Sequence, residues 1–262
     1  MLYGTFAYLQ TLKLKRMETN SKQYRLVPTF GDSFGTGWNV MSDNFLRLFL
    51  VVFIMAIVTA PLNVGQFKFD AADFHLRHFG NWDWENIFRL GTFGIFAAFY
   101  GLIALLYTFL AAPVFRYGSR MMFVQAVRKE KPDFETLIRG FMDNYLSIIL
   151  ANLLVTALVI LGLFALIVPG IIIACRLAFV SYIVMDKKVD PIEAVEMSWR
   201  LTRGYGGTIF MIGFVAFFLI ILGLMMLIVG IFPALIWINS AFATLYESVI
   251  REKEKVTETI TA

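Results

Sequence analysis

One arginine stands inside an otherwise apolar stretch of the chain. Arg176 lies six residues after Gly170, roughly 9 Å along a helix, and it is the only charged residue between 145 and 185. An arginine left in hydrocarbon costs roughly 2.5 kcal/mol or more, so polar partners are expected. Asn239 and Ser240 follow Pro233 at a similar spacing and are, with hairpin-tip carbonyls, the expected partners. Arg176 is then either a structural tie between helix hairpins or a polar site for a solute or lipid headgroup.

Two histidines are the other residues that suggest chemistry. His75 and His78 are three residues apart, close to Asp70 and Asp73, so a metal site can be drawn. The spacing is not diagnostic of one, and the aromatic segment 66–89 around them is typical of chain resting among lipid headgroups. We therefore predict no metal and no other cofactor.

The remaining motifs that would indicate an enzyme do not occur. The single cysteine, Cys175, lies in an apolar run, which predicts a buried apolar residue and excludes a disulfide framework. There is no nucleophile elbow, no phosphate-binding loop and no zinc-protease motif. The sequence predicts a protein that is not an enzyme.

The composition is that of a membrane protein. Of 262 residues, 59% are hydrophobic and only 16% are charged. Apolar runs of about 20 residues are long enough to span the hydrocarbon of a bilayer. The net charge of +4 does not indicate nucleic acid, because the basic residues cluster next to these runs.

The runs predict an all-α membrane protein with six transmembrane helices, arranged as three antiparallel hairpins. The expected spans are about 45–64, 90–112, 145–167, 171–185, 207–229 and 234–250, within a membrane domain at 32–250. Pro113 is expected to end the second span, and Pro169-Gly170 to turn the third into the fourth. Residues 1–31 form an N-terminal extension without a cleavable signal pattern, and the charged tail 251–262 is expected to fray.

The basic residues fix the expected orientation. With the N-terminus in the cytoplasm, nineteen of the 23 Lys and Arg residues lie on the cytoplasmic side. Only Lys68, Arg77 and Arg89 lie outside. This bias predicts that both termini are cytoplasmic. Glu247, near the inner end of the sixth span, is expected to meet a cytoplasmic Arg or Lys.

A short amphipathic helix is expected on the cytoplasmic side before each hairpin. Asp32-Ser33 and Asp133 are the expected caps of the first two helices. In the third, Asp190 and Pro191 fit the helix start, and Ile192, Val195 and Trp199 form one apolar stripe. Gly204 can end that helix. The stripe is suited to lying in a membrane surface.

These units indicate an internal repeat. Asp43-Asn44 before the first span matches Asp143-Asn144 before the third. The hairpin tips are also alike, with Leu166–Gly170 resembling Leu227–Gly230. The repeat predicts three similar hairpins in one bundle.

Much of residues 32–250 resembles an uncharacterised bacterial family of six-helix integral membrane proteins, a domain of unknown function. A related region occurs as the membrane part of some glycerophosphodiester phosphodiesterases. The residues that carry the resemblance are Gly37-Trp38, Asn44, Arg139-Gly140-Phe141, 168–172, Arg176, Tyr182, Asp186, Glu193-Ala194, 198–204 and Tyr246. The resemblance implies a fold and a bacterial cytoplasmic (inner) membrane. It implies no hydrolysis, because the residues of the phosphodiesterase domain are not in this sequence.

The leading functional hypothesis is a non-enzymatic inner-membrane protein that acts as a scaffold or accessory subunit, or handles a lipid-like ligand. Its expected partners are membrane lipids and either another protein or a second copy of the chain. The alternative is a small-solute transporter or channel that uses Arg176 and Asn239.

Overall fold

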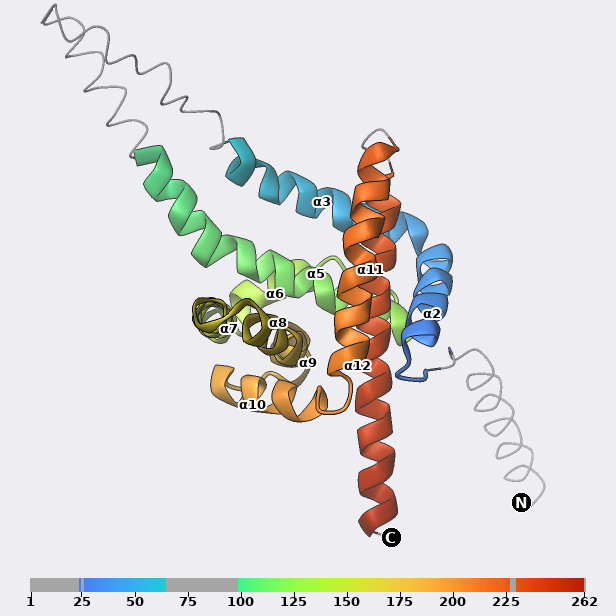
Figure 1. Ribbon diagram of the computed structural model, residues 1–262. Helices are drawn as coiled ribbons and strands as arrows, with labels where there is room; N and C mark the ends of the chain where they lie inside the picture. The colour runs from blue at the N-terminus through green and yellow to red at the C-terminus, as the bar shows by residue number, and fades with distance from the viewer. Residues whose placement is uncertain (1–23, 25, 65–98, 227–229, 262) are drawn as a thin grey trace, which may run out of the picture. The chain divides into compact units, whose positions relative to one another are not determined.

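The structure is all-helical over the residues that it describes. It is a computed structural model that describes residues 24, 26–64, 99–226 and 230–261, and no strand occurs in these ranges. The elements (Figure 1) are α2 (Phe30–Asp43), α3 (Phe45–Val64), the π-helical turn η2 (Tyr107–Ala111), α5 (Ala112–Val127), α6 (Thr136–Met142), α7 (Tyr145–Ala165), α8 (Ile167–Arg176), α9 (Val180–Lys187), α10 (Pro191–Leu201), α11 (Gly206–Met225) and α12 (Ile231–Thr261). Residues 99–106 are also helical and run directly into η2.

Several of these helices have the length and hydropathy of membrane spans. Within the described ranges four qualify, namely Phe99–Val127, Tyr145–Ala165, Ile167–Lys187 and Gly206–Met225. A fifth crossing is possible if α2 and the first part of α3, which meet at 95°, are taken together. The prediction of an all-α protein with apolar helices of transmembrane length is therefore confirmed.

The chain divides into two compact units. The first unit comprises the described residues within Met1–Leu48, Met122–Pro132 and Leu201–Ala262, and the second those within Phe49–Met121 and Asp133–Arg200.

In the first unit, α12 packs against both α2 and α11. The backbones of α2 and α12 touch at Gly37, where a Cβ atom would lie 2.9 Å from the backbone nitrogen of Ala241. Next to this contact, Nε1 of Trp237 donates a hydrogen bond of 3.0 Å to the carbonyl of Phe34. The Trp237 ring also makes an edge contact with Trp38, with 5.1 Å between the ring centroids. A close backbone contact and one hydrogen bond thus hold α2 against α12.

In the second unit, α7 packs against α8 and α9. The short helix α6 sits on α5, because a Cβ at Gly118 would lie 2.8 Å from the carbonyl oxygen of Thr136. All five residues from Val180 to Val184 at the start of α9 are buried, so the first part of this helix is enclosed on every side. The exposed side chains of α7 are large and apolar, among them Leu161 and Phe164. That surface is suited to lipid.

Proline and glycine positions explain where the helices differ from the predicted bounds. The reversal between α7 and α8 lies at Leu166, whose backbone is extended, so Pro169-Gly170 do not form the turn. Pro169 lies in the first turn of α8, where no N–H is needed.

Pro113 also does not end its helix. The backbone N–H of Ala112 bonds to the carbonyl of Tyr107, the five-residue step of a π-turn, and the helix continues as α5 to Val127. A π-turn is one way in which a helix accommodates a local disruption. The twelve residues 116–127, which lie beyond the expected end of the second span, are therefore helical.

The caps and the tail differ in smaller ways. α2 is capped by Thr29 and not by Asp32-Ser33: the Thr29 side chain accepts a hydrogen bond from the Asp32 backbone N–H. Asp133 accepts from the N–H of Glu135, but α6 itself begins only at Thr136. The tail beyond residue 250 continues α12 to Thr261. By contrast α3 has the predicted bounds, and α10 begins at Pro191 as expected.

Candidate functional site

The expected fourth span is broken beside Arg176. α8 ends at Arg176 and α9 begins at Val180, whose N–H bonds to the carbonyl of Leu177, so the carbonyl of Arg176 loses its partner in the helix. In a membrane, each such group costs several kcal/mol unless another group bonds to it. The hydroxyl of Ser198, in α10, donates a hydrogen bond of 2.7 Å to the carbonyl of Arg176. Helix α10 therefore caps the end of α8.

The Arg176 side chain also contacts α10. Its Cζ atom lies 5.8 Å from the centre of the Trp199 ring, within the range of a cation–π interaction. The positive charge stands in the last turn of α8, at the negative end of the helix dipole. Sequence reasoning identified Arg176, Ser198 and Trp199 separately, and the structure brings the three together in the second unit.

α10 divides into a buried face of small side chains and an exposed face. Ala194 and Ser198 are fully buried, whereas Ile192 is 69% and Trp199 44% exposed. Val195 lies between, half-buried. The turn after the helix contains Gly204 at φ +96, a conformation that glycine adopts without strain. The expected apolar stripe is thus present, and most of it is not covered by protein.

The other expected polar residues, Asn239 and Ser240, lie in α12 of the first unit. The amide nitrogen of Asn239 donates 2.8 Å to the carbonyl of Leu235 in its own helix. The hydroxyl oxygen of Ser240 is buried and has no hydrogen-bond partner among the described residues. Because Arg176 belongs to the second unit, these residues are placed only within α12.

Glu247 forms a buried ion cluster in the first unit. Its two carboxylate oxygens accept from Nε of Arg128 and Nε of Arg251, each at 2.8 Å, and its side chain is only 6% exposed. Arg128 follows α5, whose end was expected to carry cytoplasmic basic residues. The prediction that Glu247 meets an Arg or Lys is therefore confirmed, and the cytoplasmic position of these residues stays a prediction.

A second polar cluster lies nearby in the same unit. The hydroxyl of Tyr24 donates 2.6 Å to Asp43, and Nζ of Lys129 donates 3.1 Å to the same carboxylate. The Lys129 ammonium also lies 3.5 Å from the centre of the Tyr24 ring. Burial and then the hydrogen bond to Asp43 raise the pKa of Tyr24 above its usual value. This cluster holds the chain before α2 against the turn that follows α5.

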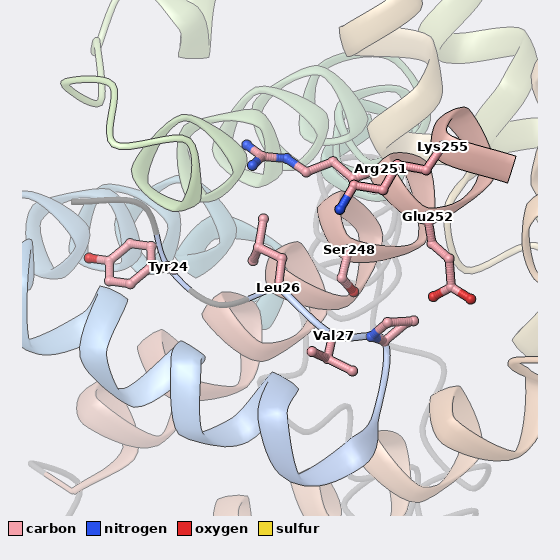
Figure 2. A pocket seen from close by; sticks show the side chains of 8 residues that line it. Tyr24, Leu26, Val27, Ser248, Arg251, Glu252 and Lys255 are labelled. Carbon is pink, nitrogen blue, oxygen red and sulfur yellow. The ribbon is translucent and has the colours of Figure 1, made fainter. Parts of the chain in front are cut away.

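A pocket of about 340 Å³ lies between residues 24–28 and α12 (Figure 2). It is lined by Tyr24, Leu26, Val27, Pro28, Ser248, Arg251, Glu252 and Lys255. Most of its polar groups already have partners in the protein: Arg251 bonds to Glu247, Ser248 to the carbonyl of Leu245, and Glu252 to Tyr205. The pocket therefore offers few unused groups to a ligand.

Sequence reasoning missed a second arginine that, like Arg176, contacts an aromatic ring of another helix. Arg120 lies beyond the expected end of the second span at Pro113, but it is in α5 and donates a hydrogen bond to the Ser181 hydroxyl. Its Cζ atom is 5.7 Å from the ring of Tyr182. A signal was present in the spacing, because Arg120 follows Pro113 by seven residues, as Arg176 follows Pro169.

The histidines His75 and His78 lie outside the described residues, as does the whole aromatic segment 66–89. Within the described part of the chain, no three His, Cys, Asp or Glu side chains are grouped as metal ligands would be.

The fold and these contacts define a class: a helical protein in which several helices are apolar and long enough to cross a membrane. The chain matches no family model, no curated protein and no solved structure.

Proposed function

We propose that the chain is a non-enzymatic, multi-pass protein of the bacterial cytoplasmic membrane, with both termini in the cytoplasm. It acts through the lipid contacts of its short amphipathic helices, as a scaffold or accessory subunit or by handling a lipid-like ligand. The observation that carries the proposal is α10. Its apolar side chains Ile192 and Trp199 are exposed, while Ser198 on its other face fastens the helix to the end of α8.

A helix held in this way is suited to a membrane surface. Charged residues adjoin the exposed apolar residues, with Lys187 and Lys188 before α10 and Arg200 and Arg203 near its end. Basic residues near an anionic leaflet contribute roughly 1 kcal/mol each, and aromatic and aliphatic side chains add hydrophobic insertion. Both contributions require the same orientation of α10.

The proposal includes six spans arranged as three repeated hairpins. Each short helix packs on the second helix of a hairpin: α2 on α12 at Gly37, α6 on α5 at Gly118, and α10 on α8 at Ser198. An aspartate–lysine pair also recurs. Lys129 bonds to Asp43 at 3.1 Å and Lys188 to Asp143 at 2.9 Å, and both lysines have positive φ after a helix end. These likenesses support the repeat, with the first part of α12 as the sixth span.

The transporter alternative requires Arg176 and Asn239 to face one polar passage. The amide of Asn239 bonds within its own helix, and Arg176 lies against Trp199. These contacts favour structural roles for both residues. We therefore place transport second.

Spin labels on α10 test the proposal. With Cys175 changed to Ala, single cysteines at Ile192 and at its neighbour Glu193 are labelled in lipid vesicles. Ile192 belongs to the apolar stripe, and Glu193 lies on the exposed polar side of the same turn. We expect the label at 192 to be accessible to oxygen dissolved in lipid, and that at 193 to a water-soluble relaxing agent. Equal exposure of both labels to water would contradict the proposal.

A further inference from the structure

Two arginines lie one turn apart on α5, where its apolar run ends. Residues 99–115 contain no charged side chain, and Arg116 and Arg120 follow immediately. Side chains four residues apart project from the same face of a helix. In the sequence the uncharged run extends from Leu90 to Phe115, 26 residues, and about 20 helical residues are enough to cross the hydrocarbon core. The pair is therefore placed to meet the boundary between hydrocarbon and headgroups.

One member of the pair is held in place by α9. Arg120 bonds to the hydroxyl of Ser181 and lies over the ring of Tyr182, and both of these residues are buried. A hydroxyl and a ring position the guanidinium without neutralising its charge. Arg116 is exposed one turn earlier, toward the apolar run.

The pair differs from other arginines of the chain in having no acidic partner. Arg128 and Arg251 share Glu247, and Arg139 pairs with Glu135 and Asp133. Neither Arg116 nor Arg120 forms an ion pair with any described residue. Two like charges on one face of a helix leave a site of net positive charge.

We infer that Arg116 and Arg120 bind the phosphate of an anionic lipid headgroup from the cytoplasmic leaflet. Guanidinium groups present paired N–H donors that match phosphate oxygens. The exposed Arg116 can reach the headgroup, and the fixed Arg120 supplies the second charge. The inference rests on the proposed membrane orientation but does not require that α10 lies in the membrane surface.

Native mass spectrometry of the full chain, released from nanodiscs of equal phosphatidylcholine and phosphatidylglycerol, tests the inference. The variants are Arg116→Gln, Arg120→Gln and the double variant. Arg139→Gln is the matched control, because that arginine is exposed on α6 and already paired. We expect each substitution in the pair to weaken retention of phosphatidylglycerol about fivefold, which corresponds to about 1 kcal/mol for one basic residue near anionic lipid. The control is expected to retain it like the wild type.

Equal retention of phosphatidylglycerol by the wild type and the double variant would overturn the inference. Arg120 also fastens α5 to α9, so Arg120→Lys and the single exposed change Arg116→Gln keep the test valid if Arg120→Gln fails to fold. Inorganic phosphate, titrated onto wild type in pure phosphatidylcholine, separates the two sources of the anion. Saturable binding of free phosphate without a preference for phosphatidylglycerol would overturn the lipid assignment. The spin-label result on α10 does not depend on the lipid-retention or phosphate-binding measurements, so the two proposals can fail separately.

Discussion

At the scale of single residues, buried charge is the feature that most constrains this chain. Glu247 is enclosed in α12 and is compensated by Arg128 and Arg251. Arg120 is held by a hydroxyl and an aromatic ring, neither of which carries a charge. The first arrangement satisfies its charges within the protein, and the second leaves positive charge for a partner. This difference is why we assign a structural role to Glu247 and a binding role to the arginine pair.

Replacing Glu247 by Gln should destabilise the protein strongly. The change removes the buried carboxylate that Arg128 and Arg251 share, and both arginine side chains are themselves partly buried. We expect the free energy of unfolding to fall by about 3 kcal/mol, as when one partner of a buried ion pair is removed. Denaturant titrations of both proteins in detergent micelles measure this difference in the free energy of unfolding.

Glu196→Gln on the exposed face of α10 is the control for this prediction. An unfolding curve for Glu247→Gln that coincides with that of Glu196→Gln would show that the cluster contributes nothing to stability.

At the scale of elements, the contacts of the short helices depend on small side chains. α2 reaches the backbone of α12 only because residue 37 is glycine. α10 reaches the end of α8 through Ala194 and Ser198, which are both small and buried. In α10 the large apolar residues Ile192 and Trp199 stay exposed, whereas in α2 Phe34 is buried and Trp38 is half exposed. Each short helix can therefore bind protein on one face and lipid on the other.

Two glycines of α2 provide a matched test of this docking. A methyl group at Gly37 would come within 2.9 Å of the Ala241 backbone, whereas a methyl group at Gly35 meets nothing within 4 Å. We expect Gly37→Ala to lower the thermal midpoint of unfolding, because backbone atoms of α12 cannot move aside. Gly35→Ala should instead raise stability by about 0.5–1 kcal/mol, since alanine is the better helix former. A higher midpoint for both variants would rule out a tight α2–α12 contact.

At the scale of the whole molecule, the orientation of the chain is still a prediction from the positions of Lys and Arg. It can be measured with single cysteines in a Cys175→Ala background. We expect a membrane-impermeant maleimide added to intact cells to label a cysteine at Asn81, in the expected outer segment, but not one at Lys253. Permeabilised cells should label both positions. Labelling of Lys253 in intact cells would reverse the topology.

The sequence by itself determined the class of this protein and most of its helices. In hydrocarbon the backbone N–H and C=O groups of a single segment can bond only within a helix, so long apolar runs predict helices. Accordingly α3, α7 and α11 lie close to the expected bounds. The Asp190-Pro191 start of α10 and the basic partner of Glu247 were also predictable, because caps and buried charges have few solutions.

Only the tertiary structure decided what depends on contacts between distant segments. The π-turn before Pro113 is stabilised by hydrogen bonds within its own helix, and the break after Arg176 by a hydrogen bond from α10. Neither feature can be predicted from hydropathy. The partner of the Arg176 backbone is 22 residues away and that of Arg120 is 61 residues away, distances at which spacing along the chain carries no geometric information. A charged side chain can be located from sequence, but whether its charge is neutralised or left available is decided by what the fold places against it.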